Sequence, residues 1–233
     1  MTDRLFALIP AAGTGARMGT MVPKQYQRLG RQTMLEHAID ALLAAPDLEH
    51  VLVVVSPNDI AHRELAPRAR VSFVTVGGAT RAESVRNGLR VLRASVALHD
   101  DDWVLVHDAA RPCLAREELM RLMTAVADDE VGGLLAVPVA DTLKRAAGGR
   151  VAATVERDGL WRAATPQMFR AGLLARALAN LTDDAAPTDE AAAVERLQLR
   201  PRLVEGLTTN IKVTVPSDWP LAEAILRAQG RWT

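Results

Sequence analysis

The sequence predicts an α/β protein of three layers, in which helices cover both faces of a mostly parallel sheet. From residue 5 to Val139, apolar runs typical of strands alternate with segments of helical periodicity, as in parallel sheets. Val51 to Val55 are five consecutive apolar residues, as expected of a strand buried on both faces. The chain has 233 residues, and 49% of them are apolar, so one domain with a full core can form, with or without an appendage.

The expected elements follow from periodicity and from capping residues. Strands are expected at residues 5–9, 51–55, 71–76, 103–106, 134–137 and 211–215. Helices are expected at 33–45, 81–93, 116–126, 171–181 and 189–197, followed by a terminal helix that Ser217 caps. Thr33 and Glu36 have the spacing of a capping box. Thr188 is the expected N-cap of the helix that follows it, with acidic residues in the first turn.

The alternation stops after Val139. Residues 142–145 and 151–155 read as two short strands around the turn Gly148-Gly149. This segment can be a hairpin laid on the sheet or an arm that reaches a neighbouring subunit, and the pattern alone slightly favours the hairpin on the sheet. The triplet Thr165-Pro166-Gln167 reads as a turn.

Charge and cysteine content exclude several classes of function. Basic and acidic residues number 28 each, which argues against a broad nucleic-acid or membrane-surface binder, because such proteins carry a basic excess. Cys113 is the single cysteine, so a reducing compartment is expected. No run of 18 apolar residues and no signal peptide is found, and we therefore expect a cytoplasmic protein with no membrane span.

The loop after the first expected strand indicates a site for a polyphosphate. Gly13 and Gly15 are followed by Arg17 and Lys24, and small residues let backbone N–H groups approach an anion closely. The glycine spacing G-x-G-x-x-x-G is one residue too long for a dinucleotide-binding loop, and Lys24 lacks the neighbours of a P-loop. The loop therefore predicts binding of a nucleoside triphosphate in a different manner.

Further polar groups follow other strands, and in open α/β sheets ligands bind at the carboxyl ends of the strands. Gly77-Gly78 precedes Arg81 and Ser84, and Asp108 follows the strand at 103–106. Asp108 is the best metal candidate, because Mg²⁺ takes one or two carboxylates together with phosphate oxygens. It can instead be a partner of Arg111. His107 is more consistent with packing than with catalysis, and no cluster suits zinc.

Read together, these segments resemble the 2-C-methyl-D-erythritol 4-phosphate cytidylyltransferase family. The matching segments, which span nearly the whole chain in the expected order, are Pro10 to Gly19, Pro23-Lys24-Gln25-Tyr26, Gly77-Gly78 with Arg81 and Ser84, Val106 to Pro112, Asp141-Thr142-Leu143-Lys144, Thr165-Pro166-Gln167, Thr188-Asp189-Glu190 and Asn210-Ile211-Lys212-Val213-Thr214. Each match is modest alone, but the ordered set is specific. The chain departs from some members at Ala79, where they have an acidic residue that can contact the nucleotide.

The resemblance implies a Mg²⁺-dependent enzyme that transfers CMP from CTP to methylerythritol phosphate and releases pyrophosphate. It implies one Rossmann-like nucleotidyltransferase domain over residues 1–233, with an arm at about 139–160 that forms a homodimer. Catalysis would depend on Arg17, Lys24 and Lys212, and Asp108 would hold the metal. The CTP contacts would be Pro10, Ala11, Ala12, Gly13, Thr14, Gly15, Arg17, Lys24, Gly78, Arg81, Ser84, Ala109 and Lys212. The methylerythritol phosphate contacts would be Thr142, Arg157, Thr165, Thr188, Asp108 and Arg111.

Two other functions are compatible with parts of the pattern. A ribitol-5-phosphate cytidylyltransferase would share the loop, the metal site and the fold, and would differ in the alcohol pocket. A nucleotide-binding regulatory module without chemistry would keep Gly13 and Gly15 but has no need of Lys212 or of the alcohol-site threonines. In the transferase, the attacking phosphate monoester is already anionic, so positioning and charge neutralisation suffice and no general base is needed.

Overall fold

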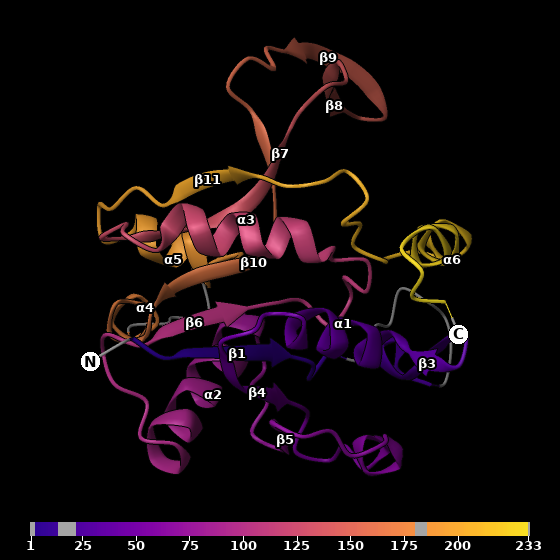
Figure 1. Cartoon of the computed structure of the whole chain (residues 1–233). Coiled ribbons are helices and arrows are strands. Elements are labelled where there is room, and N and C mark those ends of the chain that lie inside the picture. Colours follow the sequence, from indigo (N-terminus) through magenta and orange to yellow (C-terminus); the bar gives the residue numbers. More distant parts are fainter. Residues whose placement is uncertain (1–2, 14–21, 180–185, 233) are drawn as a thin grey trace.

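The structure, a computed structural model, describes residues 3–13, 22–179 and 186–232. A sheet of seven strands lies at its centre (Figure 1). Their order is β11 (Arg202–Glu205), β7 (Gly132–Pro138), β10 (Trp161–Arg170), β6 (Trp103–Val106), β1 (Leu5–Pro10), β4 (Leu48–Val54) and β5 (Val71–Val74). Only β10 runs antiparallel to its neighbours β6 and β7, whereas the other pairings in this sheet are parallel. The predicted fold class, a mostly parallel α/β sheet, is confirmed.

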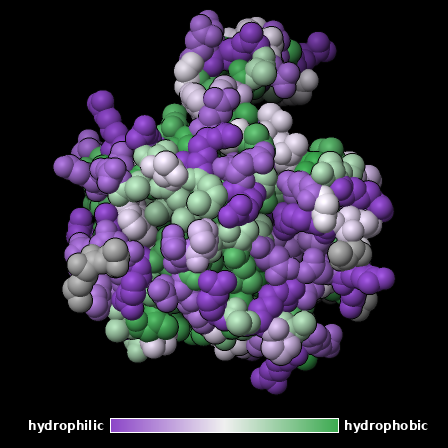
Figure 2. Space-filling model, viewed as in Figure 1, coloured by the Kyte–Doolittle hydropathy of each residue, from purple (hydrophilic) through white to green (hydrophobic). Residues whose placement is uncertain are grey.

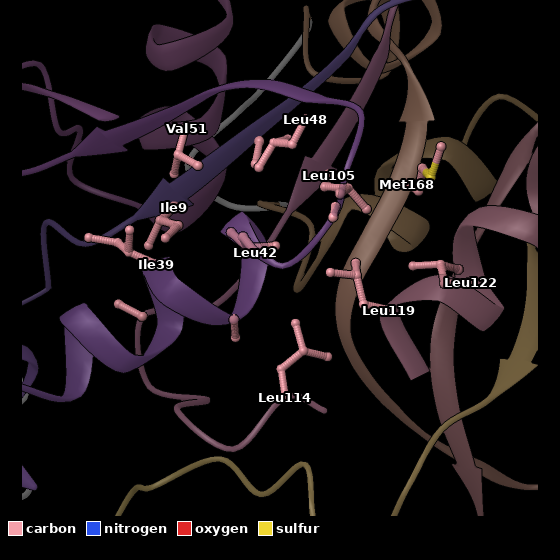
Figure 3. Packing of buried hydrophobic residues seen from close by; sticks show 14 of the residues in the cluster. Ile9, Ile39, Leu42, Leu48, Val51, Leu105, Leu114, Leu119, Leu122 and Met168 are labelled. Atoms are coloured by element: carbon pink, nitrogen blue, oxygen red, sulfur yellow. The ribbon is translucent and has the colours of Figure 1, made fainter. Parts of the chain in front are cut away.

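The alternation of side chains along β1 produces the three layers. Leu5, Ala7 and Ile9 pack on one face with the helices α1 (Met34–Leu43) and α3 (Arg116–Val126). Figure 3 shows Ile9 of this cluster together with Ile39 and Leu42 of α1. Phe6 and Leu8 pack on the other face with α2 (Arg81–Ser95), α4 (Ala171–Ala177) and α5 (Glu190–Glu195). Burying one such side chain completely contributes roughly 1.5–3 kcal/mol, so the two apolar faces fix the position of the strands.

Several short elements lie outside the seven-stranded sheet. They are the single-turn 3₁₀ helices η2 (Lys24–Tyr26) and η3 (Ala61–Glu64) and the paired strands β2 (Arg28–Leu29) and β3 (Gln32–Thr33). The terminal helix α6 (Asp218–Ala228) packs with β2 and with Val213 in a small separate cluster. No helix in the described ranges is long and apolar enough to cross a membrane.

Capping explains where several helices begin. Thr33 and Glu36 form the predicted capping box of α1, and Thr80 and Glu83 form another at α2. At α5, the expectation that Thr188 is the N-cap was wrong, because Asp189 occupies that position and accepts a hydrogen bond from the backbone N–H of Ala192. Ser217 precedes α6 but its side chain makes no capping bond.

Two sequence expectations about strands were wrong. Residues 165–167, read as a turn, lie inside β10, whose pairing with β7 is irregular between Ala163 and Gln167. Residues 211–215 form no strand; the segment is anchored by a hydrogen bond from the N–H of Val213 to the carbonyl of Ala110. The last strand of the sheet along the chain is instead β11, at one edge. Both segments depend on distant partners, which a local pattern cannot report.

The hairpin after β7 stands away from the body of the protein (Figure 1). Its strands β8 (Leu143–Ala147) and β9 (Arg150–Val155) pair with each other in a separate sheet. Gly148 and Gly149 form the turn with φ of 54° and 74°, which favours glycine. Most of the hairpin is exposed, including Val151 at 67%, and Figure 2 shows hydrophobic side chains among hydrophilic ones there. The structure therefore differs from the pattern-based preference for a hairpin laid on the sheet.

Candidate active site

A pocket of about 350 Å³ opens where the parallel strands end. Its walls come from the loop after β1, from η2, from the start of α2, from the loop after β6 and from Lys212. The predicted nucleotide contacts that line it are Pro10, Ala11, Ala12, Gly13, Lys24, Gly78, Arg81, Ser84, Ala109 and Lys212. Asp108 also lines it, together with Gln25, Thr80 and Ala110, which the sequence analysis did not assign. Thr14, Gly15 and Arg17 lie outside the described residues.

The carboxylate of Asp108 is the centre of charge in this pocket. Its oxygens lie 2.9 Å from Nε of Arg81, 2.8 Å from Nζ of Lys212 and 3.8 Å from Nε of Arg111. Burial acts to raise the pKa of Asp108, but the neighbouring cations hold that pKa well below its usual range. Asp108 is therefore ionised at neutral pH. The predicted contact with Arg111 is present, and Asp108 also lines the pocket, while its role as a metal ligand stays a prediction.

Arg81 joins Asp108 to a second, buried carboxylate. Its Nη1 lies 2.5 Å from Oε1 of Glu190, whose side chain is 1% exposed. Burial raises the pKa of Glu190 above its ordinary value, although Arg81 opposes the shift. The two carboxylates raise the pKa of Arg81, although burial opposes this. Sequence reasoning missed Glu190 as a site residue; the available signal was its place in the segment Thr188-Asp189-Glu190.

Lys24 binds the backbone of the extended segment that carries Lys212. Nζ of Lys24 donates a 2.8 Å hydrogen bond to the carbonyl of Val213, the residue after Lys212. The adjacent Gln25 donates from its side-chain amide to the carbonyl of Ala11, over 3.0 Å. These bonds hold η2 against both the loop after β1 and the extended segment, so they bring ammonium groups distant in sequence to the same edge of the sheet.

The glycine pair after β5 lets the chain pass close to its neighbours. A Cβ on Gly77 would lie 2.4 Å from Cβ of Ala12 and 2.7 Å from the carbonyl oxygen of Val55. Ser84 Oγ accepts from the N–H of Gly78 and donates to the carbonyl of Thr80. Ser84 therefore shapes the pocket wall that it also lines.

Ala79 lines the first pocket and brings no acidic group to it. The N–H of Ala79 donates to the Glu83 carboxylate over 2.7 Å. This hydrogen bond belongs to the start of α2, so Glu83 acts here on the backbone of the loop.

A second pocket, of about 360 Å³, shares Lys212 with the first. Arg111, Arg162, Thr208, Asn210 and Thr214 are among its polar lining residues. Nη1 of Arg111 donates to the carbonyl of Asn210 over 2.6 Å. Lys212 and the two arginines give this pocket a positive lining, which suits an anionic ligand.

The remaining predicted contacts of the alcohol phosphate do not gather in either pocket. Thr165 is buried, and its hydroxyl accepts from the N–H of Asp108. Thr188 is exposed beside α5 and lines neither pocket. Thr142 and Arg157 are exposed near the arm, where Arg157 donates to the carbonyl of Ala140. Within one chain, the structure therefore brings Asp108 and Arg111 together with the lysines but leaves the other four outside.

His107 is a structural residue, as the sequence analysis favoured. Its Nε2 lies 3.0 Å from the carbonyl oxygen of Arg111, which can only accept a hydrogen bond. That contact fixes the proton on Nε2, so Nδ1 accepts from the hydroxyl of Thr165. Burial lowers the pKa of His107 to about 4. The ring is therefore neutral at pH 7, and both nitrogens are engaged in positioning the loop that carries Asp108.

The family model described as 2-C-methyl-D-erythritol 4-phosphate cytidylyltransferase matches residues 5–228. The chain belongs to this family. A relative with that name from Dechloromonas aromatica is 53% identical and covers 97% of this chain and 99% of its own. Another from Laribacter hongkongensis is 57% identical, with 96% of each chain covered. The resemblance found in the sequence is thereby confirmed.

Solved structures agree with the family assignment. A crystal structure of a 4-diphosphocytidyl-2C-methyl-D-erythritol synthase superposes with a TM-score of 0.86 at 44% identity, covering 97% of this chain and all of the other. The cytidylyltransferase of Francisella tularensis gives a TM-score of 0.81 at 32% identity, with 96% and 100% covered. The whole chain therefore has the same fold as these solved structures.

The buried neutral His107 predicts a stability change in mild acid. Below pH 6.5 the unfolded chain protonates this ring while the folded chain does not, so stability is lost as the pH falls toward about 4. Between pH 7 and pH 5 we expect His107 to lower the free energy of unfolding by about 2 kcal/mol. Urea denaturation at each pH measures it.

The His107→Gln variant should have a lower free energy of unfolding than the wild type at pH 7. Between pH 7 and pH 5, that free energy should fall less in the variant than in the wild type. The exposed His99→Gln is the matched control and should keep the wild-type profile. Equal declines in wild type and His107→Gln would contradict the assignment of a neutral, buried His107.

Proposed function

We propose that the edge of the sheet around Asp108 and Lys212 carries out the reaction of the family. In that reaction CMP passes from CTP to 2-C-methyl-D-erythritol 4-phosphate, giving 4-diphosphocytidyl-2-C-methyl-D-erythritol and pyrophosphate. One observation carries the proposal: Lys212 lines both pockets and contacts Asp108. A group transferred between ligands in the two pockets would pass beside its ammonium.

CTP is proposed to occupy the first pocket. The small side chains from Pro10 to Gly13 and at Gly78 leave room for a flat base close to the backbone. Lys24, Arg81 and Lys212 supply positive charge for the triphosphate. Thr14, Gly15 and Arg17 remain predicted contacts in the same loop. Because Ala79 carries no acidic group, we assign base recognition to backbone groups of the walls.

The alcohol phosphate is proposed to enter the second pocket, beside Arg111 and Lys212. A phosphate oxygen of this ester attacks the α-phosphorus of CTP in line, and pyrophosphate leaves from the opposite side. The attacking oxygen is already anionic, so the chain supplies orientation and positive charge. The neutral His107, with both ring nitrogens hydrogen-bonded, supports a mechanism without a histidine base.

A divalent cation such as Mg²⁺ is proposed at Asp108. No cluster of three or more acidic, histidine or cysteine ligands occurs in the described part of the chain, so the protein offers one carboxylate there. That donor set fits Mg²⁺, which binds through one or two carboxylates and completes its shell with phosphate oxygens and water. Bound there, the cation would neutralise charge on the phosphates.

The arm is proposed to form a homodimer and to bring Thr142 and Arg157 to the site of the partner. Their exposure near a hairpin that stands away from its own body supports this. Thr165 is proposed to act through the backbone of Asp108, and Thr188 stays a predicted contact. The cytoplasmic location also stays a prediction.

Pyrophosphate release from CTP with methylerythritol phosphate and Mg²⁺ tests the function directly. We expect turnover with methylerythritol phosphate and much slower turnover with ribitol 5-phosphate. The family and the relatives are named for transfer to methylerythritol phosphate. Faster turnover with ribitol 5-phosphate would support the alternative substrate. CTP binding without pyrophosphate release from either would support a regulatory module.

Lys24→Ala and Lys212→Ala should each lower kcat by about 10²–10³, because each removes a charge that stabilises the transition state. Initial rates of pyrophosphate release and thermal melting would measure activity and folding separately. Arg90→Ala, on the exposed side of α2, is the matched loss of one positive charge. This variant should keep the wild-type activity and melting temperature. Near-normal kcat in both purified lysine variants would refute their roles.

Val151→Asp should convert a dimer into a monomer, because it places a charge on an exposed apolar position of the arm. Size-exclusion chromatography with light scattering should give about twice 25.1 kDa for the wild type and the monomer mass for the variant. Ile60→Asp changes a similarly exposed residue outside the arm and should leave the dimer intact. A monomeric wild type, or a dimeric Val151→Asp, would contradict the proposed arm.

A further inference from the structure

Glu190 lies at the edge of the site without lining either pocket. It is the first residue of α5, and it is 1% exposed. Rigid contacts hold this end of the helix: the Gln167 side chain of β10 donates to Asp189 and accepts from the N–H of Ala191. The position of the Glu190 carboxylate is therefore fixed by the packing of a helix on the sheet.

Arg81 is the contact between Glu190 and the pocket. Its Nη1 lies 2.5 Å from Oε1 of Glu190, and its Nε lies 2.9 Å from Oδ1 of Asp108. Different nitrogens of one planar guanidinium thus bind the two carboxylates, so the contact with Glu190 sets the orientation of the nitrogen that faces Asp108. Arg81 itself lines the nucleotide pocket.

Glu190 is the second carboxylate in the group of charges around Asp108. Arg81, Arg111 and Lys212 bring three positive charges, and Asp108 and Glu190 bring two negative charges. Without Glu190, the guanidinium of Arg81 would have Asp108 as its single carboxylate partner among these groups. Arg81 would then turn toward Asp108 and compete with Lys212 for Oδ2, because arginine favours binding both oxygens of a carboxylate.

Stability alone gives Glu190 a weak reason to be charged. A buried ion pair is often no more stabilising than apolar residues of the same volume. Here, moreover, Oε2 of Glu190 and Nη2 of Arg81 are buried and have no hydrogen-bond partner among the described atoms. The pair is therefore incompletely satisfied as a structural element, and its clear consequence is the orientation of Arg81.

We propose that Glu190 is a positioning residue for cytidylyl transfer: it holds Arg81 on Oδ1 of Asp108 alone, so that Oδ2, which contacts Lys212, can pass to the divalent cation. It touches neither substrate and acts through Arg81. The inference rests on the function proposed above, because it assigns the cation to Asp108. It predicts that loss of the Glu190 charge weakens the use of the cation more than the binding of CTP.

Glu190→Gln removes the charge and keeps the size of the side chain. We expect kcat to fall, and the Mg²⁺ concentration for half-maximal rate to rise, each by about 10- to 100-fold, as for other residues that orient a metal ligand. The affinity for CTP measured without Mg²⁺ should change by less than about threefold, because the contacts between protein and nucleotide are retained. Glu195→Gln, exposed on the same helix, is the matched control and should behave as the wild type.

A binding measurement without turnover separates positioning from general damage. Titration calorimetry of CTP, with and without Mg²⁺ and in the absence of the alcohol phosphate, gives the gain in affinity due to the cation. That gain should shrink by about tenfold in Glu190→Gln. Loss of activity in parallel with a lower melting temperature, with the Mg²⁺ dependence unchanged, would overturn the proposal. So would wild-type kcat and Mg²⁺ dependence.

A double-mutant cycle keeps the proposal testable if Glu190→Gln folds poorly. In an Arg81→Gln background, a further Glu190→Gln change should have almost no added effect on the Mg²⁺ dependence, because Glu190 acts through Arg81. Additive effects would overturn the proposal. Glu190→Asp keeps the charge but is one methylene shorter, so its Mg²⁺ dependence should lie between those of the wild type and Glu190→Gln.

These outcomes are distinct from a failure of the proposed function. A wild-type protein that releases no pyrophosphate with either alcohol phosphate would refute the function itself. An active wild type with an unaffected Glu190→Gln would refute only the role of Glu190.

Discussion

The site depends on one ionised carboxylate, Asp108, that is kept in a nearly buried position by surrounding cations. Burial alone would favour its protonated form. Arg81, Arg111 and Lys212 reverse that preference, and they come from α2, from the loop after β6 and from the segment before α6. Because ligand sites in open α/β sheets form where strands end, the parallel strands supply the edge at which these segments meet.

Charge balance explains how a chain of zero formal net charge holds an anion site. Arg81, Arg111 and Lys212 lie close together, and Asp108 and Glu190 offset part of their mutual repulsion. Two of the three lysines in the chain are in the pocket. The pockets therefore have a positive lining although the chain as a whole carries no formal net charge.

The sequence was informative where structure is local and less so where it depends on distant partners. The strand β1, the capping box of α1 and the strand-end groups Gly78 and Asp108 were foreseen from short patterns, and Lys212 was foreseen in the site although its segment is not a strand. The strand β10 was missed, because its pairing with β6 and β7 overrides a proline-containing local pattern. Glu190 was read as a helix-terminal acid, since nothing local reveals a partner 109 residues away.

The three cations around Asp108 are not equivalent, and the difference bears on the proposed transfer reaction. Arg81 is also held by Glu190, and Arg111 by the carbonyl of Asn210. The side chain of Lys212 is 43% exposed, compared with 25% and 12% for the two arginines. Moving a partly solvated ammonium costs less than moving a buried, doubly bound guanidinium. Lys212 is therefore the cation best able to exchange Asp108 for a phosphate, while the arginines keep the carboxylate ionised and in place.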